Sequence, residues 1–258
     1  MFKFFIFFNL INLYIFGCCC NENNNKNNNI GNIKNSYDKD KKDVKNVILL
    51  TTGALNPVHK GHINSLKLAQ DYLENKGFVV EKIYLSPSSD IYLNDKQNRG
   101  KIDCFYKFEY RLKMCQLAVE DFKKENKDNE KYNIEVSDWE GKQSTFVDFP
   151  NVVEHFQNKN KDKLVFYICG SDHYGNVKNT NLENVVVIKR DTDIVSLENK
   201  KKHFIIVDNS NSDFSSTRAR EIIKKIKDKE NIDYNTKLLE RYLYSSVIGF
   251  ILTINKKL

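Results

Sequence analysis

The sequence predicts an α/β protein with a parallel β-sheet and helices on both faces of the sheet. Short apolar runs rich in β-branched residues alternate with longer stretches of helical periodicity. The first run, residues 47–50, contains no polar side chain, which is typical of a strand buried on both faces. Such alternation implies parallel strands joined by right-handed crossovers, so a ligand site is expected beyond the carboxyl ends of the strands.

Six strands and three clearly amphipathic helices are expected along the chain. The strands are predicted over the apolar runs 47–50, 79–85, 134–136, 164–169, 185–188 and 204–207. Helical spacing is clear in 66–73, 110–118 and 219–226, where apolar side chains recur every three or four positions. The last apolar stretch, 247–254, is too short to span a bilayer, and we expect a terminal helix or strand, or a subunit contact.

The composition is that of one folded domain rather than of a fibrous or wholly disordered chain. Of the 258 residues, 40% are hydrophobic and 29% are charged, with 3 Pro and 10 Gly. The 41 Lys and Arg exceed the 34 Asp and Glu by 7, which favours anionic ligands, but no basic-aromatic patch indicates nucleic acid. The six Cys form no Cys-x-x-Cys pair, which argues against structural zinc.

Residues 1–17 are predicted to be a signal-like hydrophobic leader. They are nearly all apolar, with one cation at Lys3, and their core is short for a membrane span. The cysteines that follow, Cys18, Cys19 and Cys20, are either small residues at a cleavage site or acylation sites. The leader indicates entry into the secretory pathway or a plastid-type organelle. A mispredicted start would leave the protein cytoplasmic.

Residues 18–45 are predicted to form a disordered linker, followed by the folded domain at 46–258. Nine of the sixteen residues in 21–36 are Asn. Such a segment has too few apolar side chains for burial to offset its ordering entropy. Membrane contact is therefore expected only through the leader, if the leader is retained.

The stretch between the first strand and the first helix carries the strongest functional signal. Gly53 allows a tight turn, Pro57 stiffens the exit, and the following helix start presents unpaired N–H groups to an anion. His59 and His62 are three positions apart, so both rings can face one point. Two imidazole donors beside a helix N-terminus suit the polyphosphate of a nucleotide.

Other interpretations of this stretch stay open. The two histidines could cap the helix, pack in the core or face solvent. They could also form half of a metal site, although no acidic or Cys ligand stands nearby at metal-ligand spacing. A P-loop motif and a Gly-x-Gly-x-x-Gly fingerprint are both absent, so those two kinds of phosphate site are excluded.

A second candidate segment, residues 214–220, follows the last predicted strand. Ser215 or Ser216 can serve as N-cap, and the hydroxyl and N–H groups there can meet a triphosphate. Arg220, one turn further along, supplies a forked cation. The alternative is that Asp213 and the serines only cap the helix, while Arg220 faces water.

Together, the two segments resemble the nicotinamide/nicotinic acid mononucleotide adenylyltransferases of the nucleotidylyltransferase superfamily. Residues 53–62 are similar to the HxGH motif of the superfamily, and 214–220 to the Ile-Ser-Ser-Thr-x-x-Arg motif of the family. The resemblance covers residues 46 to about 245. It implies a Rossmann-like fold of nucleotidylyltransferase type, adenylyl transfer from ATP to a pyridine mononucleotide in NAD biosynthesis, and Mg²⁺ bound through the ATP phosphates.

The resemblance also implies a role for each residue that matches a family motif. The catalytic residues would be His59, His62 and Arg220. ATP would be bound by Gly53, Ala54, Lys60, Gly170, Asp172, Arg190, Ser215, Ser216 and Thr217. The mononucleotide would be bound by Leu55, Asn56, Ser86, Asp90, Tyr92, Arg111 and Trp139, with Trp139 stacked on the pyridine ring. No protein side chain is implied as a metal ligand.

The sequence departs from the family pattern at three places. Ala54 and Leu55 replace the usual Ser-Phe, which removes a hydroxyl donor to phosphate. His59 stands where members of the eukaryotic type often have Thr. Only twelve residues separate Asp172 from residue 185, which removes a loop whose aromatic residue helps to grip the pyridine ring. Tyr174 is a candidate substitute for that residue.

Other functions stay open at this point. The chain could be a cytidylyltransferase or a pantetheine-phosphate adenylyltransferase, or a nucleotide-binding homologue without turnover. Trp139 could be a core residue and Asp172 a helix cap. Catalysis in the preferred interpretation needs no general base, because the attacking phosphate is already ionised. The sequence leaves open the choice between the two mononucleotides and whether the protein is a homo-oligomer.

Overall fold

The computed structural model describes residues 45–126, 131–190, 193, 195, 203–208 and 214–255. The predicted leader and the predicted linker lie outside these ranges, apart from Lys45. Among the described helices, none combines the length and the apolar character that a membrane crossing requires.

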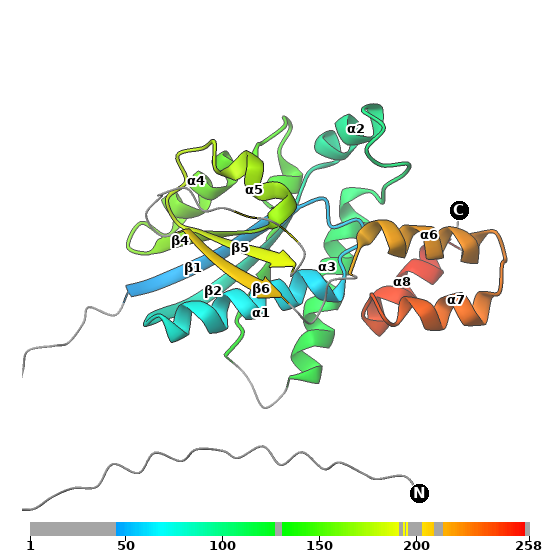
Figure 1. The fold of residues 1–258 in the computed structure, drawn as a ribbon. Helices are drawn as coiled ribbons and strands as arrows, with labels where there is room; N and C mark the ends of the chain where they lie inside the picture. The colour runs from blue at the N-terminus through cyan, green and yellow to red at the C-terminus, as the bar shows by residue number, and fades with distance from the viewer. Residues whose placement is uncertain are drawn as a thin grey trace, which may run out of the picture. The chain divides into compact units, whose positions relative to one another are not determined.

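A six-stranded parallel sheet forms the centre of the domain, in the order β3-β2-β1-β4-β5-β6 (Figure 1). The predicted parallel α/β sheet is therefore confirmed. The strand order reverses beside β1, and sheets of this kind bind ligands at the carboxyl ends of the strands near the reversal. The strands are β1 (Lys45–Gly53), β2 (Phe78–Pro87), β3 (Ile134–Val136), β4 (Leu164–Gly170), β5 (Val185–Arg190) and β6 (His203–Asp208).

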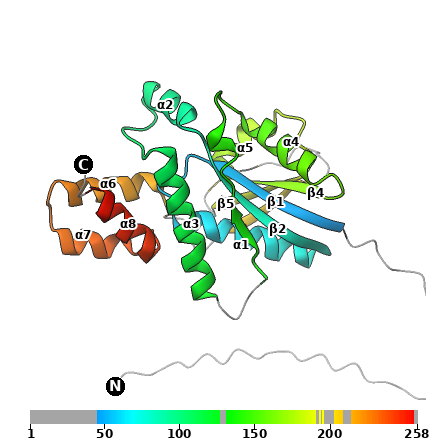
Figure 2. The same cartoon turned by 180° about the vertical axis from the view of Figure 1, so that it is seen from behind.

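Helices cover both faces of the sheet, with α4 and α5 on one face and α1 and α3 on the other (Figures 1 and 2). The last three helices follow β6 and lie on the α1 and α3 side. The helices are α1 (Lys60–Asn75), α2 (Asp90–Asn98), α3 (Phe108–Glu125), α4 (Phe149–Lys159), α5 (Ser171–Val177), α6 (Ser216–Lys227), α7 (Ile232–Leu239) and α8 (Ser245–Asn255), with a short 3₁₀ turn, η1 (Glu140–Lys142).

The side chains of β1 supply both hydrophobic cores. Val47 and Leu49 pack with the helices on the α1 side, whereas Ile48 and Leu50 pack with α4 and α5. All four are at most 2% exposed. Successive side chains of a strand point to opposite faces, so burial on both faces explains why this run has no polar residue.

The apolar stretch 247–254 forms most of α8, as one of the predicted alternatives stated. Val247, Ile248 and Ile251 are buried in the core that α3 also lines. The start of α8 is fixed to α3 because the carboxylate of Asp121 accepts hydrogen bonds from the backbone N–H and the hydroxyl of Ser246, both at 2.8 Å. The C-terminal helix is therefore an integral part of the domain.

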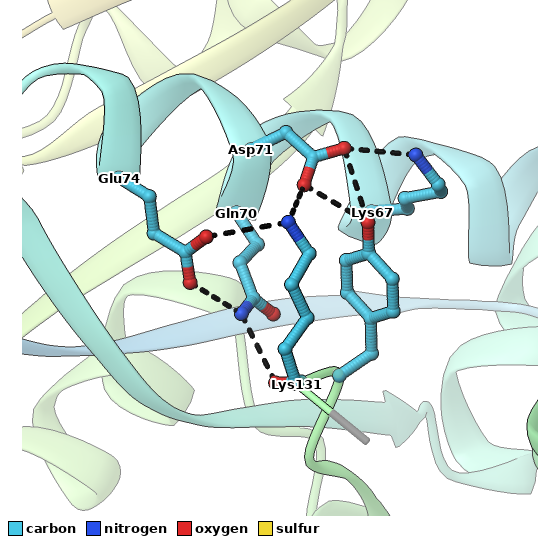
Figure 3. Close-up of polar contacts among 6 residues, drawn as sticks. Lys67, Gln70, Asp71, Glu74 and Lys131 are labelled. Atoms are coloured by element: carbon cyan, nitrogen blue, oxygen red, sulfur yellow. Dashed lines mark hydrogen bonds and ion pairs between the residues drawn. The ribbon is translucent and has the colours of Figure 1, made fainter. Parts of the chain in front are cut away.

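A polar cluster ties α1 to the residues just before β3 (Figure 3). Asp71 accepts a hydrogen bond from the hydroxyl of Tyr132 at 2.9 Å and pairs with Lys67 at 2.8 Å. Gln70 donates to the backbone carbonyl of Lys131 at 3.1 Å. These contacts anchor the approach to β3, an edge strand of only three residues.

Candidate active site

A cavity of about 540 Å³ lies at the carboxyl ends of β1, β4 and β5. The N-terminal ends of α1 and α6 also border the cavity, and Figure 1 shows α6 beyond the ends of the strands. The volume lies within the usual range for sites that bind small molecules. A helix N-terminus carries a partial positive charge, so two of them at one cavity favour an anionic ligand.

Buried hydrogen bonds hold the loop that follows β1 in place. Arg111 is fully buried and donates to the backbone carbonyl of Ala54 at 2.9 Å. The side chain of Asn56 donates to the carbonyl of Cys104 and accepts from the N–H of Tyr106, both at 3.0 Å. These contacts fix the backbone immediately before the two histidines.

Gly61 lets the first turn of α1 approach the start of α6. A Cβ at this position would meet the Cβ of Phe214 at 2.7 Å and Nδ1 of His59 at 3.1 Å. The first contact is closer than real Cβ atoms come to another carbon, and the second is tight, so a side chain here would push the two segments apart. The glycine between the histidines is thus required by packing between two remote segments.

His59 and His62 stack at the N-terminus of α1. Their ring centroids are 3.6 Å apart with an interplanar angle of 24°, and both rings line the cavity. The backbone N–H of His59 donates to Nδ1 of His62 at 3.0 Å. Burial lowers the pKa of His62 to about 4. His62 is therefore neutral near pH 7, and because Nδ1 accepts a hydrogen bond, its proton lies on Nε2.

The start of α6 joins the loop after β1. Ser216 donates from its hydroxyl to the carbonyl of Pro57 at 2.9 Å, and Arg220 donates from Nη1 to the carbonyl of Asn56 at 2.9 Å. Ser215 is the N-cap of α6, and its hydroxyl accepts from the N–H of Arg218 at 3.4 Å. The two predicted phosphate-binding segments therefore meet at one cavity.

The turn from β4 into α5 forms another part of the wall. Gly170 is the N-cap of α5, and a Cβ on it would meet the Oδ1 atom of Asp172 at 2.6 Å. Asp172 and His173 both line the cavity. Burial lowers the pKa of His173, against the opposing effect of Asp172 and Asp148. This part of the wall therefore combines a carboxylate with a neutral imidazole.

The cavity brings together most of the predicted site residues. Those on its wall are Gly53, Ala54, Leu55, Asn56, His59, His62, Tyr92, Gly170, Asp172, Ser215, Ser216, Thr217 and Arg220. Their position is established, and the contacts that they make with a ligand stay predictions.

Five predicted residues do not line the cavity. Lys60 donates to the carbonyl of Glu240 at 2.9 Å. The buried Ser86 donates to Glu140 at 2.8 Å. Asp90 and Arg111 form an ion pair at 2.9 Å. These side chains contact other protein groups instead.

Trp139, the fifth of these residues, stacks on His155, with ring centroids 3.7 Å apart and an interplanar angle of 8°. Its ring packs against the core on the α4 and α5 side. This is the alternative position weighed for a lone Trp, and a role for Trp139 at the pyridine ring stays a prediction. Arg190 ends β5, and its side chain lies outside the described part of the chain.

Glu140 is a wall residue that the sequence did not single out. It is only 4% exposed and accepts hydrogen bonds from the hydroxyls of Thr52 and Ser86. Burial raises its pKa, although the hydrogen bonds and Arg111 oppose the rise. Its only sequence signal was its place next to Trp139, and no pattern indicated that it would be buried.

An aromatic wall closes the cavity on the side of α2. Tyr92 and Phe146 stack, with ring centroids 5.7 Å apart and an interplanar angle of 21°. Phe146 is 50% exposed and lines the cavity. Nζ of Lys96 lies 4.9 Å from the centre of the Tyr92 ring. Phe146 was missed because it lies in a loop, where no periodicity marks a functional side chain.

The parallel sheet, with two helix N-termini at a cavity beyond its strands, defines an α/β protein of the Rossmann-like kind. The family is more specific: residues 50–222 match the model of the family described as cytidylyltransferase-like. The chain belongs to the cytidylyltransferase-like family. The predicted fold of nucleotidylyltransferase type is thereby confirmed.

Two similar curated proteins bear the predicted family name. A nicotinamide/nicotinic acid mononucleotide adenylyltransferase from Arabidopsis thaliana is 31% identical over 149 residues, which are 54% of this chain and 55% of the relative. Nicotinamide/nicotinic acid mononucleotide adenylyltransferase 2 from Xenopus tropicalis is 38% identical over 113 residues, which are 43% of this chain and 31% of the relative. The chain thus spans about half or less of the length of these relatives.

A solved structure gives the same fold. The nicotinic acid mononucleotide adenylyltransferase of Plasmodium falciparum, complexed with NaAD, matches with a TM-score of 0.58. The match covers 82% of this chain and 96% of that chain at 18% identity. At this identity the similarity establishes the architecture of the sheet and helices.

Proposed function

We propose that this protein transfers the adenylyl group of ATP to nicotinamide or nicotinic acid mononucleotide, forming the dinucleotide and releasing pyrophosphate, a step of NAD biosynthesis. The observation that carries the proposal is the junction of the two phosphate-binding segments, where Arg220 and Ser216 bond to the loop that leads into His59. The names of relatives that are 31% and 38% identical support the same activity.

The reaction is a displacement at the α-phosphorus of ATP. An oxygen of the acceptor's 5′-phosphate forms a new bond to this phosphorus, while the bond from the phosphorus to the oxygen that bridges to the β-phosphate breaks. Pyrophosphate leaves with the electron pair. The acceptor phosphate is ionised at neutral pH, so the protein supplies position and neutralisation of charge rather than a base.

The side chains around the cavity suit this work. Neutral His62 presents an Nε2 proton to a phosphate oxygen and does not change its charge near pH 7. Arg220 uses two of its N–H groups on Asn56 and Thr217, and its guanidinium carries five, so donors remain for the β- and γ-phosphates. The N-termini of α1 and α6 add the partial positive charge of their helix dipoles.

Mg²⁺ is the metal that such a reaction with ATP calls for. The start of α6 presents the guanidinium of Arg220 and the positive end of a helix dipole, which suit phosphate oxygens rather than a cation. Within the described ranges, no group of three or more His, Cys, Asp or Glu side chains is arranged to hold a metal ion. We propose that Mg²⁺, if bound, would be held through the ATP phosphates rather than by protein side chains, and would supply neutralisation of charge on the pyrophosphate.

Product analysis tests the proposal. In three separate reactions, the full chain is incubated with ATP, MgCl₂ and one acceptor: nicotinamide mononucleotide, nicotinic acid mononucleotide or phosphopantetheine. In a fourth reaction, CTP and phosphocholine replace ATP and the acceptor. We expect pyrophosphate and dinucleotide in equal amounts with at least one pyridine mononucleotide. Pyrophosphate release with only another acceptor would reassign the substrate, and ATP binding without any product would indicate a protein that does not turn over.

The leader and the state of assembly stay proposals as well. We propose that residues 1–17 direct the protein into the secretory pathway or a plastid-type organelle. A fluorescent fusion of the full chain should then leave the cytoplasm, and a fusion without residues 1–17 should not. Light scattering of the full chain determines whether it is a homo-oligomer.

A further inference from the structure

One part of the cavity wall accepts hydrogen bonds. Glu140 lines it and is a buried carboxylate, which has only acceptor oxygens when ionised. Thr52, at the end of β1, gives its hydroxyl proton to Glu140, and Thr51 gives its own to the carbonyl of Ile168 at 3.0 Å. Both threonine hydroxyls therefore give their protons to protein acceptors, so the Thr52 oxygen, on the cavity wall, can only accept a hydrogen bond from a ligand.

The groups around Glu140 oppose the effect of burial on its charge. Arg111, from α3, acts on it electrostatically and is itself paired with Asp90 of α2 at 2.9 Å. Tyr167 of β4 is the other titratable side chain that interacts with Glu140, and burial raises the pKa of Tyr167 far enough to keep it neutral. Burial raises the pKa of Glu140, and the two hydroxyl donors on one carboxylate oxygen oppose this rise by favouring the ionised form.

This polarity matches one part of the acceptor nucleotide and not another. The 5′-phosphate of a mononucleotide can only accept hydrogen bonds from a protein, whereas its ribose hydroxyls can donate them. Acceptor oxygens on the cavity wall therefore repel the phosphate and bind a hydroxyl. The donors of His62 and Arg220, which also line the cavity, have the opposite preference.

We propose that Glu140 is a positioning residue that acts through Thr52: it turns the Thr52 hydroxyl so that its lone pairs bind a ribose hydroxyl of the acceptor mononucleotide, which directs the 5′-phosphate toward His62 and Arg220. The inference rests on the proposed function and specifies how the acceptor is oriented. Ser86 belongs to the same hydrogen-bond network. It is a second donor to Glu140 and does not contact the nucleotide.

The test compares parent mononucleotides with their 2′-deoxy and 3′-deoxy analogues in the full-length wild type and in E140Q, T52V and T52S. In the wild type, one deoxy analogue should lose at least tenfold in kcat/KM, because a buried acceptor is left without a donor. E140Q and T52V should raise KM for the mononucleotide about tenfold, with KM for ATP changed less than twofold. Both should also use parent and analogue almost equally.

T52S keeps the hydroxyl and should lose less than T52V, a rescue that a purely structural role for the β-branched side chain does not predict. The matched control is E135Q, in the neighbouring strand β3. Glu135 is another glutamate that pairs with Lys82 at 2.8 Å on the surface, does not line the cavity, and should leave all constants unchanged. Thermal unfolding of each variant identifies any loss of fold.

Two results would overturn the inference: equal use of parent and deoxy mononucleotides by the wild type, or an equal rise of both KM values in folded E140Q. If the wild type forms no dinucleotide at all, the proposed function fails instead. Calorimetry with nicotinamide mononucleotide and its deoxy analogues then still decides the inference. Weaker binding of one analogue to the wild type but not to T52V supports it, and equal binding of all of them to the wild type overturns it.

Discussion

Arg220 donates from Nη1 to the backbone carbonyl of Asn56 at 2.9 Å, although the two residues are 164 positions apart in the chain. The contact places a guanidinium at the start of α6 beside the loop that ends in the stacked histidines. A second hydrogen bond joins the same two segments, from the hydroxyl of Ser216 to the carbonyl of Pro57 at 2.9 Å. The loop after β1 and the first turn of α6 therefore form one structural unit at the end of the sheet.

Replacing Arg220 should therefore affect both the loop and the chemistry. We expect R220M to lower kcat with ATP and a pyridine mononucleotide about 10²- to 10³-fold, the usual cost of losing one preorganised donor. R220K should recover little, because an ammonium cannot bond to Asn56 and to phosphate in the forked geometry of a guanidinium. Steady-state kinetics measures both variants.

The exposed Arg218, two positions earlier and not on the cavity wall, provides the control for Arg220. R218Q should keep the turnover of the wild type within about twofold. Wild-type turnover by R220M would remove Arg220 from the reaction.

His62 should act as a neutral donor throughout the physiological pH range. Burial lowers its pKa to about 4, so activity should not follow an imidazole titration between pH 6 and 8. H62A should lower kcat by about 10²- to 10³-fold, and H62N, which keeps an N–H donor, by less. Profiles of kcat/KM against pH for the three proteins check this. An acidic limb near pH 6.5 that disappears in H62A would show that His62 titrates normally.

The same lowered pKa has a consequence for stability. Between about pH 4 and the ordinary histidine value of 6.5, the unfolded chain binds a proton at His62 that the folded chain does not. His62 should thus make the protein lose stability as the pH falls from 6.5 toward 4. H62N should lack this loss. Urea unfolding of wild type and H62N at pH 7 and pH 5 compares the two, and identical changes in both would contradict the lowered pKa.

Gly61 should be intolerant of even a methyl group. In G61A the new Cβ meets the Cβ of Phe214 at 2.7 Å, so α1 and α6 must separate. We expect a loss of about 1 to 3 kcal/mol in the free energy of unfolding, together with a loss of activity. G61A/F214A should recover part of the stability. G249A, in open space on α8, is the control and should be neutral or stabilising. Equal behaviour of G61A and G249A would exclude the close approach.

Arg111 should be worth more to stability than any surface arginine. It is fully buried, pairs with Asp90, and donates to the carbonyls of Ala54 and Tyr106. R111M leaves these partners unsatisfied, so we expect a loss of about 3 to 5 kcal/mol. R99Q removes the exposed pair with Asp95 and should cost at most about 0.5 kcal/mol. Chemical unfolding measures both, and a small effect of R111M would mean that the buried network is weak.

The sequence predicted the sheet well because burial leaves a direct trace in residue pattern. The runs 47–50 and 185–188 lie inside strands, since a strand buried on both faces has no place for polar side chains. The convergence of His62 and Arg220 was also predictable. Both follow parallel strands, whose carboxyl ends meet at one edge of the sheet.

The inner layer of the site was not predictable from pattern. The position of Trp139 against His155, and of Ser86 against Glu140, depends on which residues the fold brings alongside. Lys60 is similar, because its side chain bonds to the backbone of Glu240, far along the chain. A motif gives the type of each residue and its approximate place, but not whether a side chain points into the cavity or supports the wall behind it.

The central claim is that the loop after β1 and the start of α6 hold one triphosphate together. Calorimetric titration of the full-length wild type, H62A, R220M and H62A/R220M with a non-hydrolysable ATP analogue tests it most directly. We predict weaker binding by each single variant and a double variant whose loss differs from the sum of the two by at least about 0.5 kcal/mol, as for residues that share a ligand. Wild-type affinity in either single variant, or strict additivity in the double variant, would contradict the claim.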